Sequence, residues 1–257
     1  MSARFEGKVA IVTGAGTGFG AAIAEAFAAE GADVLVHYRS SAQGAEHTAA
    51  RIRALGRQAE TVQGDISSAD DVQRMAEAAF AAYGRIDVLV NNVGDMVVNQ
   101  MSWRDLTPES IDHTLAVDIK GTMLMTHEFG RRMLDDQQAG AIVNIGSRVV
   151  VEGSPRAPQY AAAKYAILGI SKSYAHALAP HVRVNTLGPG FIESEALLNR
   201  EDWKTGRREA VLARTPLQRL PKPADVVPPV LFLASEDAKH ITGAFLLCDG
   251  GHSMVGA

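Results

Sequence analysis

The stretch Lys8-Val-Ala-Ile-Val-Thr-Gly-Ala-Gly-Thr-Gly-Phe-Gly20 decides the fold. Its first part, Lys8 to Thr13, is a short, largely β-branched apolar run that is typical of a buried strand. The glycines that follow let the backbone turn sharply and approach a pyrophosphate, whose charge is met by the N–H groups at the start of the next helix. An alanine-rich segment reaching Glu30 predicts that helix. The stretch indicates a dinucleotide-binding strand–turn–helix, and a tight loop without a ligand is the alternative.

Strands and helices alternate along the rest of the chain. Short connections between them predict right-handed crossovers and a parallel sheet covered by helices on both faces. Residues 1–257 are therefore expected to form one α/β domain. A cap at Thr107 and a proline at position 108 predict a long helix to about Leu134. The mixed helical segment 193–220 suits a substrate lid, although an ordinary pair of surface helices would give the same pattern.

Composition excludes several classes of function. Hydrophobic residues make up 47% of the chain and the formal charge is −4, so the basic excess that nucleic-acid binding needs is missing. The N-terminus lacks the apolar core of a signal peptide and no apolar run has membrane-spanning length, which predicts a cytoplasmic protein. The single cysteine, Cys248, sits in an apolar run and is expected in the core. The eight histidines form no recognisable metal-ligand cluster.

A phenol and an ammonium group are placed for proton transfer by the turn Gln159-Tyr-Ala-Ala-Ala-Lys164. Tyr160 and Lys164 are four residues apart, and so they lie on the same helix face. A lysine cation at this spacing favours the phenolate form of a tyrosine. Ser147 ends a buried apolar strand thirteen residues before Tyr160. By itself the Tyr-x-x-x-Lys pair could belong to a solvated helix face, and its context favours chemistry.

Together, the N-terminal glycines, Ser147, Tyr160 and Lys164 resemble the short-chain dehydrogenase/reductase family over nearly the whole chain, and within it the 3-oxoacyl-[acyl-carrier-protein] reductases. The resemblance implies a seven-stranded doubly wound Rossmann domain in which Ser147 orients the substrate oxygen and Tyr160 is the general acid or base. Lys164 would favour the phenolate and bind the nicotinamide ribose. The family segment Val-Asn-x-x-Gly reads Val117-Asp-Ile-Lys-Gly121 here, so Asp118 replaces the fourth member of the catalytic group.

The same resemblance implies the residues around the cofactor. The first turn contributes five of them, and the ends of the later strands contribute the rest, with Tyr160 and Lys164 at the nicotinamide. They are Gly14, Thr17, Gly18, Phe19, Gly20, Arg39, Ser40, Asp65, Ile66, Asn91, Gly94, Pro189, Gly190, Ile192 and Ser194.

The end of the second strand predicts NADP(H) rather than NAD(H). NAD-preferring folds place an acid there to bind the ribose 2′-hydroxyl, whereas an arginine suits the 2′-phosphate of NADP. The position of that acid is occupied by Tyr38, and Arg39 and Ser40 follow at once. A solvated surface role for Arg39 is the alternative.

For substrate, the sequence predicts a small or medium-sized, largely apolar ketone or secondary alcohol. The expected pocket, which contains one cation, consists of Met96, Val97, Arg148, Val150, Gln159, Phe191, Leu197 and Trp203. Arg148 is expected either to select a carboxylate or other polar tail or to form a structural salt bridge.

Two other functions stay open. Reduction of a 3-oxoacyl chain on acyl carrier protein is the closer one. It is disfavoured because Gln138 and His181 stand where such enzymes carry basic residues, although Arg131 and Arg132 lie nearby. A non-catalytic dinucleotide sensor or scaffold is the other. Family analogy also implies a homotetramer built on the helices at 108–134 and around Tyr160, and on the final strand.

Overall fold

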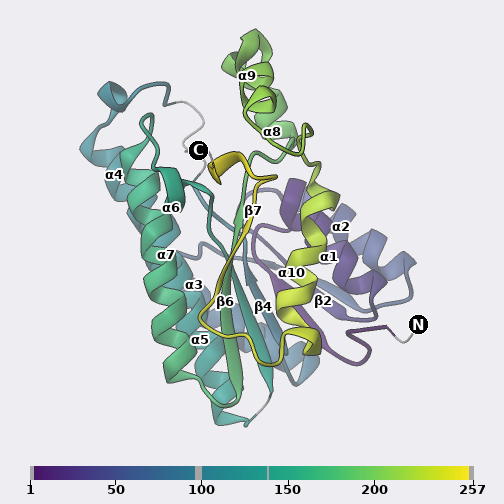
Figure 1. Ribbon diagram of the computed structural model, residues 1–257. Coiled ribbons are helices and arrows are strands. Elements are labelled where there is room, and N and C mark those ends of the chain that lie inside the picture. Colours follow the sequence, from purple (N-terminus) through teal and green to yellow (C-terminus); the bar gives the residue numbers. More distant parts are fainter. Residues whose placement is uncertain (1–2, 96–99, 138, 255–257) are drawn as a thin grey trace.

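The computed structural model describes residues 3–95, 100–137 and 139–254, and its centre is the predicted seven-stranded parallel sheet (Figure 1). The strands lie in the order β3-β2-β1-β4-β5-β6-β7, so the strand order reverses between β1 and β4. In this doubly wound order, ligands bind outside the carboxyl ends of the strands at the reversal. The strands are β1 (Val9–Val12), β2 (Asp33–Tyr38), β3 (Ala59–Gln63), β4 (Val88–Asn91), β5 (Gly140–Ile145), β6 (Val182–Pro189) and β7 (Phe245–Cys248).

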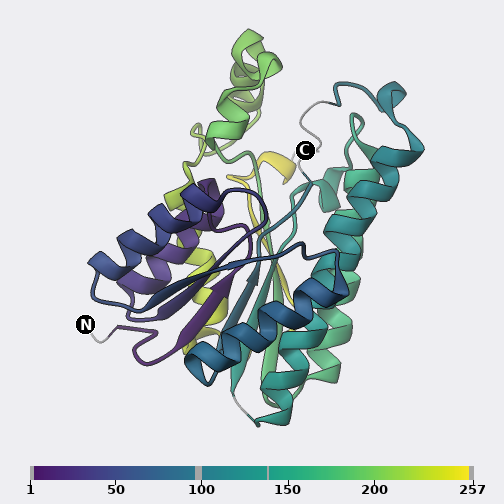
Figure 2. The ribbon, with the colours of Figure 1, turned by 180° about the vertical axis from the view of Figure 1, so that it is seen from behind.

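Helices cover both faces of the sheet, as the sequence predicts (Figures 1 and 2). Alternate residues of a strand point to opposite faces. Ala10 and Val12 of β1 accordingly join one buried core, and Val9 and Ile11 join the other. The first core is covered by α1 (Gly18–Ala29), α2 (Ala42–Ala54) and α10 (Pro223–Ala234). The second is covered by α3 (Ala69–Tyr83), α5 (Thr122–Asp135) and α7 (Pro158–Ala177).

The predicted helix from 108 to about 134 is confirmed and runs without a break from Pro108 to Asp135, but its winding changes in the middle. It consists of α4 (Pro108–Thr114), a π-helical segment η2 (Leu115–Gly121) and α5. A π-helix adds a residue to the turn and is often found at functional sites. In η2 it carries Asp118, which is fully buried. Propensity predicts the helix but not this local change of its winding.

Above the carboxyl ends of the strands stands the lid segment, defined as residues 193–220 (Figures 1 and 2). It contains α8 (Glu195–Leu198), a kinked segment η3 (Trp203–Arg207) and α9 (Arg208–Ala213). At the same end of the sheet lie α6 (Val149–Glu152) and the start of α7. The short helices η1 (Trp103–Asp105), η4 (Glu236–Ala238) and η5 (His252–Met254) complete the described elements. Cys248 is half-buried in β7 and packs against the first core.

Candidate active site

Side chains and turns of neighbouring strands fix the glycine-rich turn after β1. The Thr13 hydroxyl accepts hydrogen bonds from the backbone N–H groups of Asn92 at 2.8 Å and Val93 at 3.0 Å. The Asn92 amide donates to the Thr13 carbonyl at 2.9 Å. These bonds join the turn after β1 to the turn after β4. They therefore define the crevice at the reversal of strand order.

The glycines of this turn make a cradle that fits a dinucleotide. Gly14 and Gly18 have φ of +64° and +57°, in the left-handed region that favours glycine. A Cβ on Gly14 would lie 3.0 Å from a methyl group of Val93. The Thr17 side chain makes no cap bond to α1, whose first turn has no acidic residue. The N–H groups around Thr17, Gly18 and Phe19 are therefore suited to a pyrophosphate.

A buried histidine, which the sequence reasoning did not single out, pins this turn to the next strand. Nδ1 of His37 accepts the N–H of Gly14 at 3.0 Å, and Nε2 lies 3.0 Å from the carbonyl oxygen of Gly64. Burial lowers the pKa of His37, so the ring is neutral and its Nε2–H donates to Gly64. A polar residue that directly follows the apolar run Val34 to Val36 is the signal that could have found it.

The predicted adenosine end is open to solvent. Arg39 and Ser40 follow β2 and are both exposed. The Arg39 guanidinium lies 3.8 Å from the Asp65 carboxylate, and its side chain is 58% exposed. Asp65 accepts hydrogen bonds from the Ser67 hydroxyl and N–H, which together with Arg39 lower its pKa. Ile66 is buried and packs on Gly121 of η2, so its side chain belongs to the second core.

On α7, Tyr160 and Lys164 lie one turn apart, as predicted. The Lys164 ammonium is 5.6 Å from the centre of the Tyr160 ring and donates to the carbonyl of Ile145 at 3.3 Å. Ile145 ends β5 two residues before Ser147, whose hydroxyl accepts the N–H of Val149 at 3.3 Å. The buried lysine thus ties α7 to the end of β5. This contact places the first turns of α7 beside the carboxyl end of β5, which Ser147 follows.

Asp118 forms a direct ion pair with Lys164. Its carboxylate lies 3.0 Å from the ammonium, and the two side chains are 0% and 5% exposed. The other carboxylate oxygen accepts the N–H of Asp95 at 2.6 Å. Burial lowers the pKa of Lys164, but Asp118, with smaller contributions from Tyr160 and Asp95, raises it more. The net result is a pKa above the ordinary lysine value, so the cation is fixed.

The backbone at Gly94 lies close to the Lys164–Asp118 pair. A Cβ on Gly94 would lie 2.8 Å from the Lys164 ammonium, which explains the glycine there. The Asn91 side chain faces the sheet interior instead. Its amide donates to Asn144 at 2.8 Å and to Thr126 at 3.0 Å. It therefore braces β4 against β5 and α5.

At the end of β6, the turn is held by backbone bonds. The Pro189 carbonyl accepts the N–H of Arg148 at 3.0 Å, and the Gly190 N–H donates to Cys248 at 3.0 Å. Ile192 packs on the first core. Ser194 caps α8, because its hydroxyl accepts the Leu197 N–H at 3.4 Å.

The lid segment has a small core of its own. Leu197, Trp203 and Val211 are buried together, with Phe191 packed against them. The Phe191 ring centre lies 5.5 Å from that of Trp203 and 5.4 Å from that of His252. His252 is buried, and the sequence reasoning did not find it. Its position after a closing Asp-Gly-Gly turn gave no chemical signal.

The remaining predicted pocket residues approach the site from the α7 side. Val150 is buried on α6. Gln159 is buried on α7, and its amide donates to the side-chain oxygen of Gln100, a partner that no local pattern announced. Met96 and Val97 lie outside the described residues.

Residues 3–95, 100–137 and 139–254 show neither a membrane-spanning helix nor a cluster of metal ligands. No helix there combines the length and apolar character needed to cross a bilayer. The histidine, cysteine and carboxylate side chains of those ranges do not gather in threes as a metal site requires.

The fold and the site define a dinucleotide-fold oxidoreductase, and comparisons with known proteins agree. A family model described as enoyl-(acyl carrier protein) reductase matches residues 14–253. The chain is 38% identical to D-threitol dehydrogenase of Mycolicibacterium smegmatis, over 98% of this chain and 95% of that one. It is 34% identical to a 3-oxoacyl-[acyl-carrier-protein] reductase of Thermotoga maritima, over 96% and 98%.

A comparison with a solved structure indicates the same class of protein. A short chain dehydrogenase from Burkholderia cenocepacia in complex with NADP superposes with a TM-score of 0.88 at 33% identity, over 97% of this chain and 99% of that one. The protein therefore belongs to the short-chain dehydrogenase/reductase family, as the sequence motifs predict.

Proposed function

We propose that the protein is an NADP(H)-dependent oxidoreductase that interconverts a ketone and a secondary alcohol. The observation that carries this proposal is the buried Lys164 cation, held against the end of β5 and 5.6 Å from the Tyr160 ring. A cation buried at such a position is costly unless it is paired, and the chain provides Asp118 to pair it. This arrangement supports a proton-transfer tyrosine better than it supports a solvated helix face.

The proposed roles of the side chains follow from their chemistry. In the direction of reduction, the Tyr160 hydroxyl gives its proton to the substrate oxygen, and in oxidation the phenolate takes it back. The Ser147 hydroxyl donates a hydrogen bond to that oxygen and fixes its place. Lys164 stabilises the phenolate and binds the ribose hydroxyls of the cofactor. When bound, the nicotinamide supplies or accepts the hydride.

The preference for NADP(H) rests on the end of β2. Tyr38 offers no carboxylate there, and the exposed Arg39 and Ser40 can receive a 2′-phosphate. The NADP bound to the Burkholderia relative is consistent with this proposal. Thr17 and Phe19 would face the pyrophosphate, and Pro189, Gly190, Ile192 and Ser194 would border the nicotinamide.

Reduction of a substrate on acyl carrier protein is the second candidate, and the Thermotoga maritima relative favours it. An acidic carrier needs available cations beside the site. Arg131 is paired with Asp135 at 2.9 Å and Arg132 with Glu128 at 2.7 Å. The carboxylates of Glu128 and Asp135 beside these arginines would repel an acidic carrier, so the surface is a weaker match for it. A cofactor sensor without turnover would have no need of the Ser147, Tyr160 and Lys164 set.

The test is consumption of NADPH and of NADH with a panel of free ketones, and with a 3-oxoacyl thioester on acyl carrier protein. We expect turnover of free ketones, with a higher catalytic efficiency for NADPH. A large advantage for the carrier-bound thioester would favour the second candidate. Cofactor binding without turnover across the panel would favour the sensor, and equal or better efficiency with NADH would defeat the cofactor assignment.

A homotetramer is part of the proposal. The supporting observation is that α5 and α7 each expose a large apolar side chain, Met123 at 43% and Tyr165 at 49%. Light scattering should give a tetramer, and Tyr165→Glu should reduce the assembly. Leu55→Glu on the far side of the sheet is a matched control, because Leu55 is equally exposed at 52%. A wild-type monomer at micromolar concentration would contradict the proposal.

A further inference from the structure

Two arginines from distant parts of the chain converge on the same aromatic ring beside the proposed active site. The guanidinium of Arg148 lies 4.0 Å from the centre of the Phe191 ring, and that of Arg207 lies 5.8 Å from it. Arg148 directly follows Ser147, whereas Arg207 belongs to the lid segment. Stacking on an aromatic face holds a guanidinium through its plane, so its N–H groups can still bind carboxylate or phosphate oxygens in that plane.

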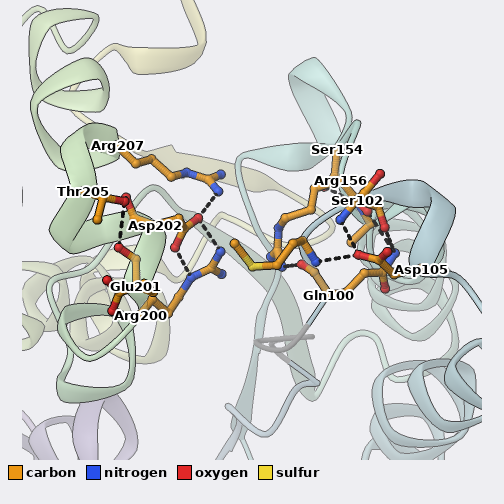
Figure 3. Close-up of polar contacts among 12 residues, drawn as sticks. Gln100, Ser102, Asp105, Ser154, Arg156, Arg200, Glu201, Asp202, Thr205 and Arg207 are labelled. Atoms are coloured by element: carbon orange, nitrogen blue, oxygen red, sulfur yellow. Dashed lines mark hydrogen bonds and ion pairs between the residues drawn. The ribbon is translucent and has the colours of Figure 1, made fainter.

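The carboxylates around these arginines are shared rather than matched one to one. Asp202 pairs with both Arg200 and Arg207, at 2.7 and 2.6 Å. Glu152 pairs with Arg148 and lies 3.9 Å from Arg214. Figure 3 shows Arg200 and Arg207 meeting at Asp202, with Arg156 and Gln100 on the facing side. Each acid therefore serves two cations.

The result is a local excess of positive charge. Four cations, Arg148, Arg200, Arg207 and Arg214, share the two carboxylates of Glu152 and Asp202. The whole chain carries a formal charge of −4, so this excess runs against the overall balance. Clustering of one sign at a cleft focuses the field on a ligand of the opposite sign.

These cations also repel one another. Burial, and then Arg207, lower the pKa of Arg148 to about 10. Burial, and then Arg200 and Arg207, lower the pKa of Arg156 to about 10. Both arginines remain charged at neutral pH, and the Tyr160 phenol acts on both. Arg148 directly follows Ser147 and shares the Phe191 ring with Arg207, so the cluster lies beside the proposed catalytic serine, where a bound anion would relieve its repulsion.

We propose that the substrate carries an anionic group, a carboxylate or a phosphate, which Arg148 and Arg207 bind while the carbonyl carbon is held at Tyr160. This inference rests on the proposed function and narrows its substrate class to ketones that carry a carboxylate or a phosphate, and to the matching alcohols. Planar guanidinium groups bind carboxylate and phosphate oxygens in pairs. Apolar neighbours such as Val150 and Phe191 suit an apolar carbon skeleton between the two ends.

The test uses substrates that differ in charge alone. Oxo acids of increasing chain length are compared with their neutral methyl esters and with the corresponding oxoalkyl phosphates. We expect the best anion to exceed its neutral partner about tenfold or more in kcat/KM, as charged hydrogen bonds allow. Arg207→Gln should raise KM for the anion by a similar factor and leave the ester unchanged. The anion with the larger Arg207-dependent effect identifies the carboxylate or the phosphate.

A matched control is Lys204→Gln, which removes one positive charge from η3 at an exposed residue. It should leave KM for the acid within about twofold. Arg207→Lys keeps the charge but loses the paired geometry, and it should fall between wild type and Arg207→Gln. Circular dichroism and the thermal midpoint show that each variant is folded.

Equal turnover of acid and ester, or equal effects of Arg207→Gln on both, would overturn the inference of an anion site. Turnover of the ketones would still support the proposed function in that case. Failure of every carbonyl would defeat the proposed function instead. The anion site is then judged by binding, from the rise in thermal midpoint with millimolar oxo acid in the presence of NADP. A rise that depends on Arg207 supports the site, and its absence rejects it.

Discussion

The two ends of the proposed dinucleotide site hold their charges in opposite ways. At the nicotinamide end, Lys164 and Asp118 are 3.0 Å apart, and their side chains are 5% and 0% exposed. At the adenosine end, Arg39 and Asp65 are 3.8 Å apart, and their side chains are 58% and 37% exposed. The first pair is closed before any ligand arrives, whereas the second is loose and screened by solvent.

The difference indicates what each end is built to do. A buried pair cannot exchange partners cheaply, so it fixes a proton-transfer group in one geometry. An exposed arginine can leave its weak carboxylate partner for a phosphate that offers paired oxygens. Position and protonation are set in advance at the nicotinamide end, and selection between ligands takes place at the adenosine end.

The largest loss of activity is expected when the Tyr160 hydroxyl is removed. Tyr160→Phe removes the group that transfers the proton and keeps the ring, and it should lower kcat by about 10²- to 10⁴-fold. Cofactor affinity, measured by NADPH fluorescence, should change little, because the ring and Lys164 remain. A variant that kept more than about a tenth of the wild-type kcat would remove Tyr160 from the proposed mechanism.

Removing one member of an ion pair should lower the free energy of unfolding more at the nicotinamide end than at the adenosine end. Lys164→Met leaves the Asp118 carboxylate buried without its cation, and it should lower the free energy of unfolding by about 3–5 kcal/mol. Arg39→Met at the exposed pair should cost less than about 1 kcal/mol. Urea unfolding measures both values. Similar costs at the two ends would contradict the contrast between a fixed pair and a loose one.

Cofactor selection should depend on the exposed end. Arg39→Ala should lower kcat/KM for NADPH by about 10- to 100-fold, the range of a charged hydrogen bond to phosphate. The same change should leave kcat/KM for NADH within about threefold, because NADH lacks the 2′-phosphate. Higher salt should weaken the NADPH preference of the wild type, since the arginine is open to solvent. An unchanged ratio of the two efficiencies would leave Arg39 as a solvated surface residue.

How much of this structure the sequence predicts depends on how far apart in the sequence the interacting residues lie. The strand–turn–helix at residues 8–30 and the Tyr160–Lys164 spacing are local patterns, and the sheet and the placement of these two residues agree with them. The link between Gly14 and His37 spans a strand and a helix, so no spacing rule announces it. Arg148 and Arg207 meet only because the lid segment folds back over the end of β5.

Asp118 shows the same limit of sequence-based prediction, although it lies in a motif that the sequence identifies. The Val-Asp-x-x-Gly pattern locates it, and the added charge is visible in the sequence. The π-helical winding of Leu115–Gly121 and the direct contact with Lys164 are not, because propensity predicts a regular helix there. Its consequence for catalysis therefore has to be argued from the structure.

Asp118→Asn should make the smallest but most specific change, in the pH dependence of the reaction. Burial lowers the pKa of Lys164, and the Asp118 carboxylate supplies the main opposing effect that raises it above the ordinary value. Loss of that carboxylate lets burial dominate, so the pKa of the buried lysine falls. The same substitution removes a negative charge that opposes the Tyr160 phenolate, so the rise of the oxidation rate with pH should move to lower pH.

The direction of the Lys164 pKa shift can be checked independently, from the pH dependence of the protein's stability. In the wild type, the folded pKa of Lys164 exceeds the unfolded value of about 10.5. The pair therefore contributes its full stability below that pH and loses it as pH rises through the folded pKa. Asp118→Asn should melt at a lower temperature than wild type near pH 7, and the two curves should approach each other above about pH 10.5. Identical rate profiles, or a stability difference that grows at high pH, would show that Asp118 does not set the charge of Lys164.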